Sequence, residues 1–375
     1  MRKIFILSLL ACVLLPVAAQ AGQTLPPDST LRRMAAQMLM VGFRGDTVGP
    51  DSDAARYVRD LGVGAVILFD VDLTGDATPG SRNITSRRQL EQTTRRLRAW
   101  AKTPLLIALD QEGGRVARLK TQYGFQSTVT AEYIGQVNSL DTTAFYASRI
   151  ADDLARSGVN VNLAPVVDLL DPDSPGLGKI QRCFSPDPDI VARNASVFID
   201  CHHRKGVACT LKHFPGSGHA RDDSHWGLVD ITDVWTERDL QPYRRLIDHN
   251  LADVIMTSHV FLRSIDPDHP ATLSRRILTD LLRGKLRYDG VILSDDMYMQ
   301  GIIDLYQIES AIVLAINAGV DMLCVGNNIS TGFEADRPFR LVDIIVSAIK
   351  DGRIPLSRVQ DANRRIAALK TRFRQ

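Results

Sequence analysis

The sequence has few cysteines, few aromatic residues and almost no excess of charge. Its 5 cysteines include no C-x-x-C pair and no zinc-ligand spacing. The 45 basic and 43 acidic residues leave a formal charge of only +2. Both surplus charges, Arg2 and Lys3, belong to residues 1–21, which contain no acidic residue. We therefore expect no nucleic-acid partner, because binding to a phosphate backbone requires a basic surplus on the folded protein.

Other features are missing as well. No low-complexity tract and no Pro/Gly-rich linker divides residues 30–375, and the first predicted strand is not followed by the G-x-G-x-x-G turn of dinucleotide-binding folds. The composition is 45% apolar, 23% charged and 6% aromatic, which is typical of a soluble globular protein. Disorder, collagen and a polytopic membrane protein are excluded, whereas one α/β barrel or two ordinary domains remain compatible with 375 residues.

The N-terminus has the features of an export signal. The two basic residues precede a short apolar run at 4–17 and an Ala-x-Ala site that ends at Ala21. This pattern predicts a signal peptide at 1–21, cleaved after Ala21, and an exported, periplasmic protein. The apolar run is too short to favour a stable membrane span. A lipoprotein acylated at Cys12 and a buried N-terminal helix remain alternatives.

From residue 22 to 375 the chain alternates between short apolar runs and amphipathic stretches. The predicted strands are residues 37–43, 62–69, 104–110, 159–167, 207–213, 253–259, 290–295 and 320–325. The predicted helices are residues 86–101, 142–157, 188–205, 237–249, 309–318, 339–350 and 356–373. Near-continuous apolar strands alternating with helices predict a parallel sheet covered on both faces. Eight such units favour a single-domain (β/α)8 TIM barrel over a doubly wound sheet.

Four cysteines lie in this predicted barrel: Cys183, Cys201, Cys209 and Cys324. Disulfides are permitted in an oxidising compartment. Since the spacings indicate no framework, we favour free and mostly buried thiols.

Polar residues recur at the carboxyl ends of the predicted strands. They are Asp110, Asp168, Lys212, His213, His259 and Ser294-Asp295-Asp296. In a barrel these ends converge on one mouth, where catalytic groups come from several strands. A single charged strand end is usually a solvated loop residue, but five of the eight strands end in this way. The pattern therefore predicts one shared site.

A Gly-rich loop after the fifth predicted strand carries an Asp-x-His pair. In an extended loop, Asp223 and His225 project to the same side and within reach of each other. A carboxylate that fixes the tautomer of a histidine makes a general acid/base unit. Two alternatives remain open, a metal site and a purely structural loop. However, His213, His219 and His225 are six residues apart and lack the H-x-x-x-H spacing, so we expect no metal and no cofactor.

Acidic residues after two other strands extend the predicted site. Asp295 directly follows an apolar strand and can project into the mouth as a nucleophile, whereas Asp296 faces away by strand alternation. The turn Asp110-Gln-Glu-Gly-Gly-Arg115 brings acids and arginines together. We assign Asp110 and Arg118 to ligand binding, since arginine binds oxygen ligands in bidentate fashion. We interpret Glu112 as part of an ion-pair network that stiffens the loop.

These motifs together resemble glycoside hydrolase family 3, and specifically its single-domain β-N-acetylglucosaminidase branch. The similarity extends from about Arg32 to Phe373. The motifs, in chain order, are Asp110-Gln-Glu-Gly-Gly-Arg-Val116, Asn162-Leu-Ala-Pro-Val-Val-Asp168, Lys212-His-Phe-Pro-Gly216, Asp223-Ser-His225 and Ser294-Asp-Asp-Met297.

The resemblance implies a retaining glycosidase in which Asp295 is the nucleophile. His225, paired with Asp223, is implied to be the general acid and then the general base, in place of the usual second carboxylate. A neutral base would avoid repelling an incoming anion, so phosphorolysis remains an alternative to hydrolysis. The resemblance also assigns Asp110, Arg118, Arg182, Lys212 and His213 to binding of the terminal sugar.

The loop also departs from the family pattern. Ser217 stands where the branch has a histidine, and Arg221-Asp222 replace small residues before Asp223. The spacing from Lys212 to His225 is retained. The departures therefore concern the leaving-group side and leave the acid/base pair in place. Residues 71–84 form an enlarged loop that either rims the cleft or is a solvated excursion.

We therefore expect an exported exo-β-N-acetylglucosaminidase, a monomer whose partner is a carbohydrate. The expected substrates are N-acetylglucosaminyl-muramic fragments of peptidoglycan or chitin-type oligosaccharides. Three alternatives remain: a family 3 β-glucosidase, an N-acetylglucosaminide phosphorylase, and a non-catalytic sugar-binding protein.

Overall fold

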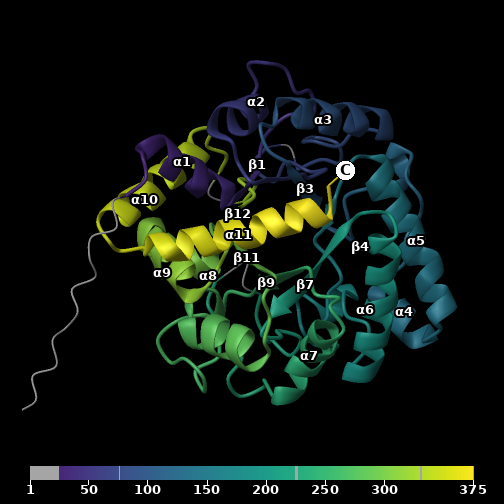
Figure 1. The fold of residues 1–375 in the computed structure, drawn as a ribbon. Coiled ribbons are helices and arrows are strands. Elements are labelled where there is room, and N and C mark those ends of the chain that lie inside the picture. The colour runs from purple at the N-terminus through teal and green to yellow at the C-terminus, as the bar shows by residue number, and fades with distance from the viewer. Residues whose placement is uncertain (1–24, 76, 224–226, 330–331, 375) are drawn as a thin grey trace, which may run out of the picture.

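The computed structural model describes residues 25–75, 77–223, 227–329 and 332–374, in which eight parallel strands close into a barrel (Figure 1). Neighbouring strands pair in chain order, and the last strand pairs with the first. The barrel strands are β1 (Leu39–Gly42), β2 (Ala65–Ile67), β3 (Leu106–Leu109), β6 (Val161–Asn162), β7 (Ala208–Phe214), β9 (Val254–Thr257), β11 (Val291–Asp296) and β12 (Met322–Val325). Each overlaps one predicted strand, so the single-domain barrel is confirmed and the doubly wound alternative is wrong.

Helices surround the barrel, and the last of them lies across one end of it (Figure 1). They are α1 (Asp28–Gln37), α2 (Asp53–Ala55), α3 (Arg87–Trp100), α4 (Ala131–Val137), α5 (Leu140–Arg156), α6 (Pro188–His203), α7 (Gln241–Asp248), α8 (Gln300–Ile303), α9 (Ile308–Ala318), α10 (Arg337–Lys350) and α11 (Leu356–Arg372). Local sequence fixes several starts. The side chains of Ser86, Ser139 and Asp187 accept backbone N–H bonds at the first turns of α3, α5 and α6.

Some elements differ from the sequence prediction. The first predicted strand, residues 37–43, was too long, because α1 continues to Gln37 and β1 covers only Leu39–Gly42. The helical segments Arg56–Leu61 and Arg276–Lys285 have wider, π-type turns and were not predicted. The predicted helix 237–249 is a short turn, Glu237–Leu240, followed by α7. Such boundaries depend on tertiary packing more than on local pattern.

The core fills the barrel and the space between strands and helices. Every residue of β1, β2, β3, β9 and β12 is buried, as expected for parallel strands covered on both faces. Gly42 is required for this packing, since a Cβ there would lie 1.9 Å from the Gly326 carbonyl oxygen. Cys183, Cys201, Cys209 and Cys324 are buried and unbridged, which confirms the expectation of free thiols.

The two ends of the barrel are finished differently. Helix α11 crosses the end where the strands begin, and there Arg372 pairs with Asp253 and Arg365 with Asp289 (Figure 1). At the opposite end two small sheets extend the loops. One joins β4 (Gln111–Gly113) to β5 (Val116–Ala117), and the other joins β8 (Val229–Asp230) to β10 (Val260–Phe261). The carboxyl ends of the strands therefore carry the elaborated loops, where sites on barrels form.

The predicted signal at 1–21, with Cys12, lies outside the described residues, so the division between residues 1–21 and 22–375 stays a prediction. None of the helices in the described part of the chain is both long enough and apolar enough to cross a membrane.

Candidate active site

A cavity of about 320 Å³ opens at the carboxyl ends of the strands, within the size range of small-molecule sites. All six described residues to which the sequence assigned substrate binding or the nucleophile role line it, and so does Asp223: Asp110, Arg118, Arg182, Lys212, His213 and Asp295. Gly176, Arg182, His213, Asp223 and Asp295 also line a smaller adjoining cavity of about 40 Å³. The barrel therefore brings these residues from several loops and strand ends to one place. Of the strand-end residues that predicted one shared site, Asp168 and His259 line neither cavity; His259 is buried and bonded to Thr272 and to the Asp296 carbonyl.

Lys212 is the buried centre of the charged cluster. Its side chain is only 2% exposed, and Nζ lies 2.9 Å from Asp110 Oδ1 and 2.7 Å from Glu112 Oε1. Arg118 Nη2 lies 3.0 Å from the other oxygen of Asp110. Lys212 lies in strand β7. The turn at Gly113-Gly114 pairs β4 with β5, so that Arg118, which follows β5, lies beside Asp110. Both glycines have positive φ, a conformation that favours glycine.

Glu112 joins this cluster to the loop after β6. It accepts two bonds from Arg182, from Nε at 2.9 Å and from Nη2 at 2.8 Å. Arg182 Nη1 also donates to the Gly176 carbonyl at 2.9 Å. The sequence interpretation of Glu112 as an ion-pair residue is confirmed, but its partners are Lys212 and Arg182, from distant segments, rather than arginines of its own loop.

The pKa shifts of Asp110, Glu112 and Lys212 all favour the charged form. Burial by itself raises the pKa of Glu112, but Arg182 and Lys212 outweigh it and lower the pKa to about 2. The pKa of Asp110 is likewise lowered, since Lys212 and Arg118 outweigh the effect of burial. Burial lowers the pKa of Lys212, yet Asp110 and Glu112 raise it above its ordinary value. Three cations thus face two carboxylates, which makes the cluster a source of N–H donors for oxygen ligands.

Asp295 and Asp296 face different surroundings at the end of β11. Asp295 lines both cavities, and its Oδ1 accepts the Asp296 N–H at 2.8 Å. The Asp296 carboxylate accepts backbone N–H groups from Tyr298 at 3.0 Å and from Gly326 at 2.9 Å. Burial, with a contribution from the charge of Asp295, raises the pKa of Asp296 to about 6. Asp296 also lines the larger cavity, so the expectation that it faces away from the mouth is wrong, but only Asp295 lines both cavities, while the Asp296 carboxylate is bonded to the backbone of neighbouring loops.

The proposed acid/base pair is only partly described. Asp223 lines both cavities with Asp295. A Cβ at Gly176 would lie 3.1 Å from Asp223 Oδ2, so the carboxylate packs against this glycine. His225 lies outside the described residues, so its pairing with Asp223 stays a prediction.

A second Asp–His pair, Asp168 and His213, joins two residues that the sequence named separately at strand ends, and its histidine lines both cavities. Asp168 Oδ2 is 2.8 Å from His213 Nδ1 and accepts the His213 backbone N–H at 3.0 Å. With Nδ1–H directed to Asp168, Nε2 of His213 is left facing Arg182 Nη2 at 3.4 Å. His219 pairs instead with Asp171. Among the described residues no three metal-ligating side chains form a cluster.

The enlarged loop after β2 rims the cavity. Val71 and Leu73 line it, together with Asn328 from the loop after β12. Arg82, which is completely buried, ties these loops together through Asp72 at 3.0 Å and Asn328 Oδ1 at 2.8 Å. The interpretation of residues 71–84 as a solvated excursion is therefore wrong.

Comparison with known proteins agrees with the motifs. The family model described as "Glycosyl hydrolase family 3 N terminal domain" matches residues 30–369. A β-hexosaminidase of Tolumonas auensis is 36% identical over 281 residues, which cover 74% of this chain and 80% of that protein.

Two solved structures have the same fold. The β-N-acetylhexosaminidase of Beutenbergia cavernae superposes with a TM-score of 0.80 at 30% identity and covers 91% of this chain and 98% of its own. A glycoside hydrolase family 3 β-N-acetylglucosaminidase of Paenibacillus sp. superposes with a TM-score of 0.82 at 31% identity over 91% of this chain. This chain spans 62% of the length of that enzyme.

Proposed function

The chain belongs to glycosyl hydrolase family 3 and is a glycoside hydrolase, and from that premise we propose that it is a retaining exo-β-N-acetylglucosaminidase. The observation that carries the proposal is the shared cavity, in which Asp295 and Asp223 are both exposed beside the cluster of Asp110, Lys212 and Arg182. The names of the relatives, β-hexosaminidase and β-N-acetylglucosaminidase, support the sugar specificity.

In the proposed first step, a carboxylate oxygen of Asp295 attacks the anomeric carbon as the bond to the leaving oxygen breaks. His225, supported by Asp223, gives its proton to that oxygen. In the second step His225 takes a proton from water, whose oxygen displaces Asp295 from the anomeric carbon. Each step inverts the anomeric carbon, so the product retains the configuration of the substrate.

The charged cluster would hold the terminal sugar during both steps. Lys212 and Arg118 have N–H groups to donate to hydroxyl oxygens, and Asp110 is an ionised acceptor between them. Arg182 and His213 lie toward the smaller cavity and would bind the same sugar from the side of Asp223. Since Glu112 and Asp168 hold these two residues rigidly, the site needs little rearrangement to bind a substrate.

The natural substrates that we propose are N-acetylglucosaminyl-muramic fragments of peptidoglycan or short chitin-type oligosaccharides. We also propose that the protein is exported and acts as a monomer in the periplasm. The support for export is the basic, apolar and Ala-x-Ala pattern of residues 1–21. Mass spectrometry of the mature N-terminus distinguishes cleavage after Ala21 from acylation at Cys12.

A direct assay tests the proposed activity. The purified protein should release nitrophenol from 4-nitrophenyl N-acetyl-β-glucosaminide and should not require phosphate. Phosphate-dependent release of a sugar phosphate would indicate a phosphorylase, and turnover of only the β-glucoside would indicate a glucosidase. Absence of turnover on both glycosides would contradict the enzyme proposed here.

A further inference from the structure

Two loops at the mouth of the barrel run side by side, residues 168–176 after β6 and residues 217–223 after β7. The Ser217 backbone N–H donates to Asp168 Oδ1 at 2.7 Å. One residue further, Gly218 packs against the backbone of Leu169, where a Cβ would lie 1.9 Å from the carbonyl oxygen. The start of the second loop is therefore held directly against the first.

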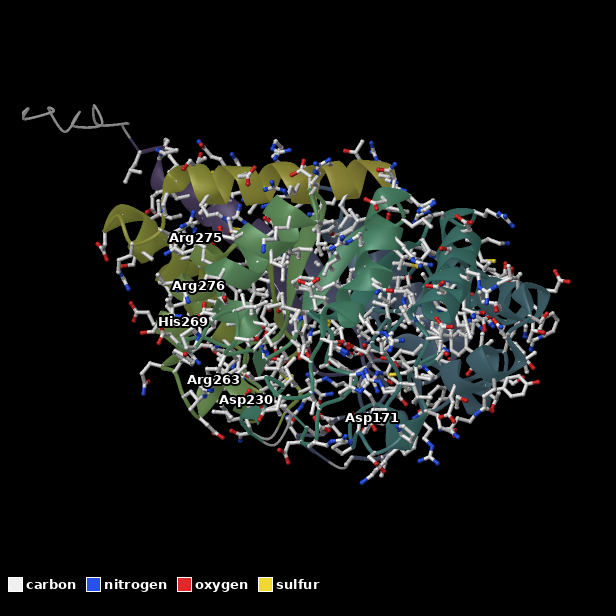
Figure 2. The ribbon with its side chains drawn as sticks, turned by 90° about the horizontal axis from the view of Figure 1, so that it is seen from below. Asp171, Asp230, Arg263, His269, Arg275 and Arg276 are labelled. Atoms are coloured by element: carbon white, nitrogen blue, oxygen red, sulfur yellow. The ribbon has the colours of Figure 1, made fainter. Side chains whose placement is uncertain are left out.

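Asp171 extends this contact along the second loop. Its Oδ2 lies 3.0 Å from Arg221 Nη2 and 3.4 Å from His219 Nδ1, and its Oδ1 accepts the Asp173 N–H at 3.0 Å. The Asp171 side chain is only 13% exposed, so its charge needs these partners. In Figure 2, Asp171 lies toward the end of the barrel opposite α11.

The contacts of Asp171 favour the charged form of its carboxylate. Burial by itself raises the pKa of Asp171, but the Asp173 amide, His219 and Arg221 together lower it below its usual value. His219 also faces Asp239, whose Oδ1 is 3.8 Å from Nε2.

The same two loops meet again at Asp223, whose carboxylate packs on Gly176. The carbonyl of Gly176 is bonded to Arg182, which is paired with Glu112. The loop 168–176 thus contacts both the cations of the sugar site and the carboxylate of the proposed acid/base pair. A shift of this loop against residues 217–223 would move Asp223 relative to the bound sugar.

We propose that Asp171 is a positioning residue: by holding His219 and Arg221 it fixes the segment that leads to Asp223 and so orients the acid/base pair toward the leaving group. The inference rests on the proposed function, because it needs Asp223 and His225 to protonate the leaving oxygen. Asp171 acts through the loop and not on the substrate.

The test uses the leaving-group dependence of kcat/KM, measured with N-acetyl-β-glucosaminides of 2,4-dinitrophenol, 4-nitrophenol and 4-methylumbelliferone. The value of kcat/KM reports the steps up to and including glycosylation, in which the leaving oxygen is protonated. The poorer the leaving group, the more this step depends on the general acid. Asp171→Asn should lower kcat/KM for the methylumbelliferyl substrate about five-fold, the upper range for an ion pair with one exposed partner, and leave the dinitrophenyl substrate nearly unchanged. Arg221→Gln should act in the same direction, and the double variant should be no worse than Asp171→Asn alone.

The matched control is Arg263→Gln, which removes an ion pair of similar exposure at the same end of the barrel (Figure 2). Arg263 Nε lies 2.7 Å from Asp230, and its side chain is 44% exposed against 56% for Arg221. This variant should change no substrate's kcat/KM by more than about two-fold.

The inference is overturned if Asp171→Asn has no effect, or lowers kcat/KM equally for all leaving groups, while Asp223→Asn shows the leaving-group-dependent loss. If Asp223→Asn itself shows no leaving-group dependence, the acid/base assignment in the proposed function fails instead. The two failures are therefore distinguishable in one set of measurements.

Discussion

Replacing Asp295 with alanine is expected to lower kcat/KM for an N-acetyl-β-glucosaminide by about 10⁴-fold or more, because removal of a covalent nucleophile eliminates the low-barrier route. Asp295 lies next to the end of β11 and faces two cavities, so its loss should leave the core intact. Thermal unfolding should therefore stay close to that of the unaltered chain, while turnover disappears.

Exogenous azide gives this prediction a second readout. If Asp295 is the nucleophile, azide can enter the space left by the carboxylate and attack the anomeric carbon, which would form an α-glycosyl azide from a β-glycoside. The control is Asp230→Asn, a partly exposed aspartate at the same end of the barrel whose partner is Arg263 (Figure 2). It should retain near-normal activity. An Asp295→Ala variant that keeps a tenth of the activity would contradict the assignment.

Replacing Glu112 with glutamine is expected to affect stability and activity together. The change leaves Lys212, which is buried, and Arg182, which is mostly buried, without the carboxylate that they share. Breaking a buried pair in this way should lower the free energy of unfolding by about 3 kcal/mol at pH 7. Because both cations are proposed to hold the sugar, their displacement should also lower kcat/KM by about 100-fold.

The stability loss should depend on pH in a defined direction. The folded pKa of Glu112 is about 2, below the value of about 4.3 for an unfolded chain. The stabilisation by the ionised carboxylate is therefore present above the unfolded pKa and is lost as the pH falls toward 2. Urea unfolding at pH 7, 5 and 3 should show the difference between the two proteins shrinking with acidity.

Glu309→Gln is the matched control for Glu112→Gln. Glu309 Oε1 lies 2.8 Å from Arg353, the same separation as between Glu112 and Arg182, but Glu309 is 53% exposed. Water screens such a pair, so its removal should leave both stability and kcat/KM nearly unchanged. Equal losses of stability and kcat/KM from the two substitutions would show that the effect of Glu112→Gln does not depend on the burial of its ion pairs.

Much of the site could be predicted because its positions follow from local pattern. Asp110, Lys212, His213 and Asp295 end or directly follow apolar strands, and parallel strands in a barrel present those ends at one mouth. The turn at Gly113-Gly114 could also be predicted from local sequence, because it depends on the backbone freedom of two adjacent glycines.

The partners of these residues could not be predicted in the same way. Glu112 was assigned to its own loop, yet it pairs with Arg182, 70 residues away. Asp171 was not singled out, and its contact with Arg221 exists only because the loops after β6 and β7 are neighbours. The strand end that places Lys212 at the mouth gives no information about the two carboxylates, Asp110 and Glu112, that pair with it there.

The sequence by itself determined the barrel, the end of it that bears the chemistry and most of the charged residues that face the cavity, because the alternation of strands and helices and the residues at each strand end are local properties. Only the tertiary structure decided which charges neutralise one another and which loops hold one another. Those choices depend on closing eight strands into a ring, which brings segments from distant parts of the chain within hydrogen-bond distance, and no pattern within one segment specifies its neighbour.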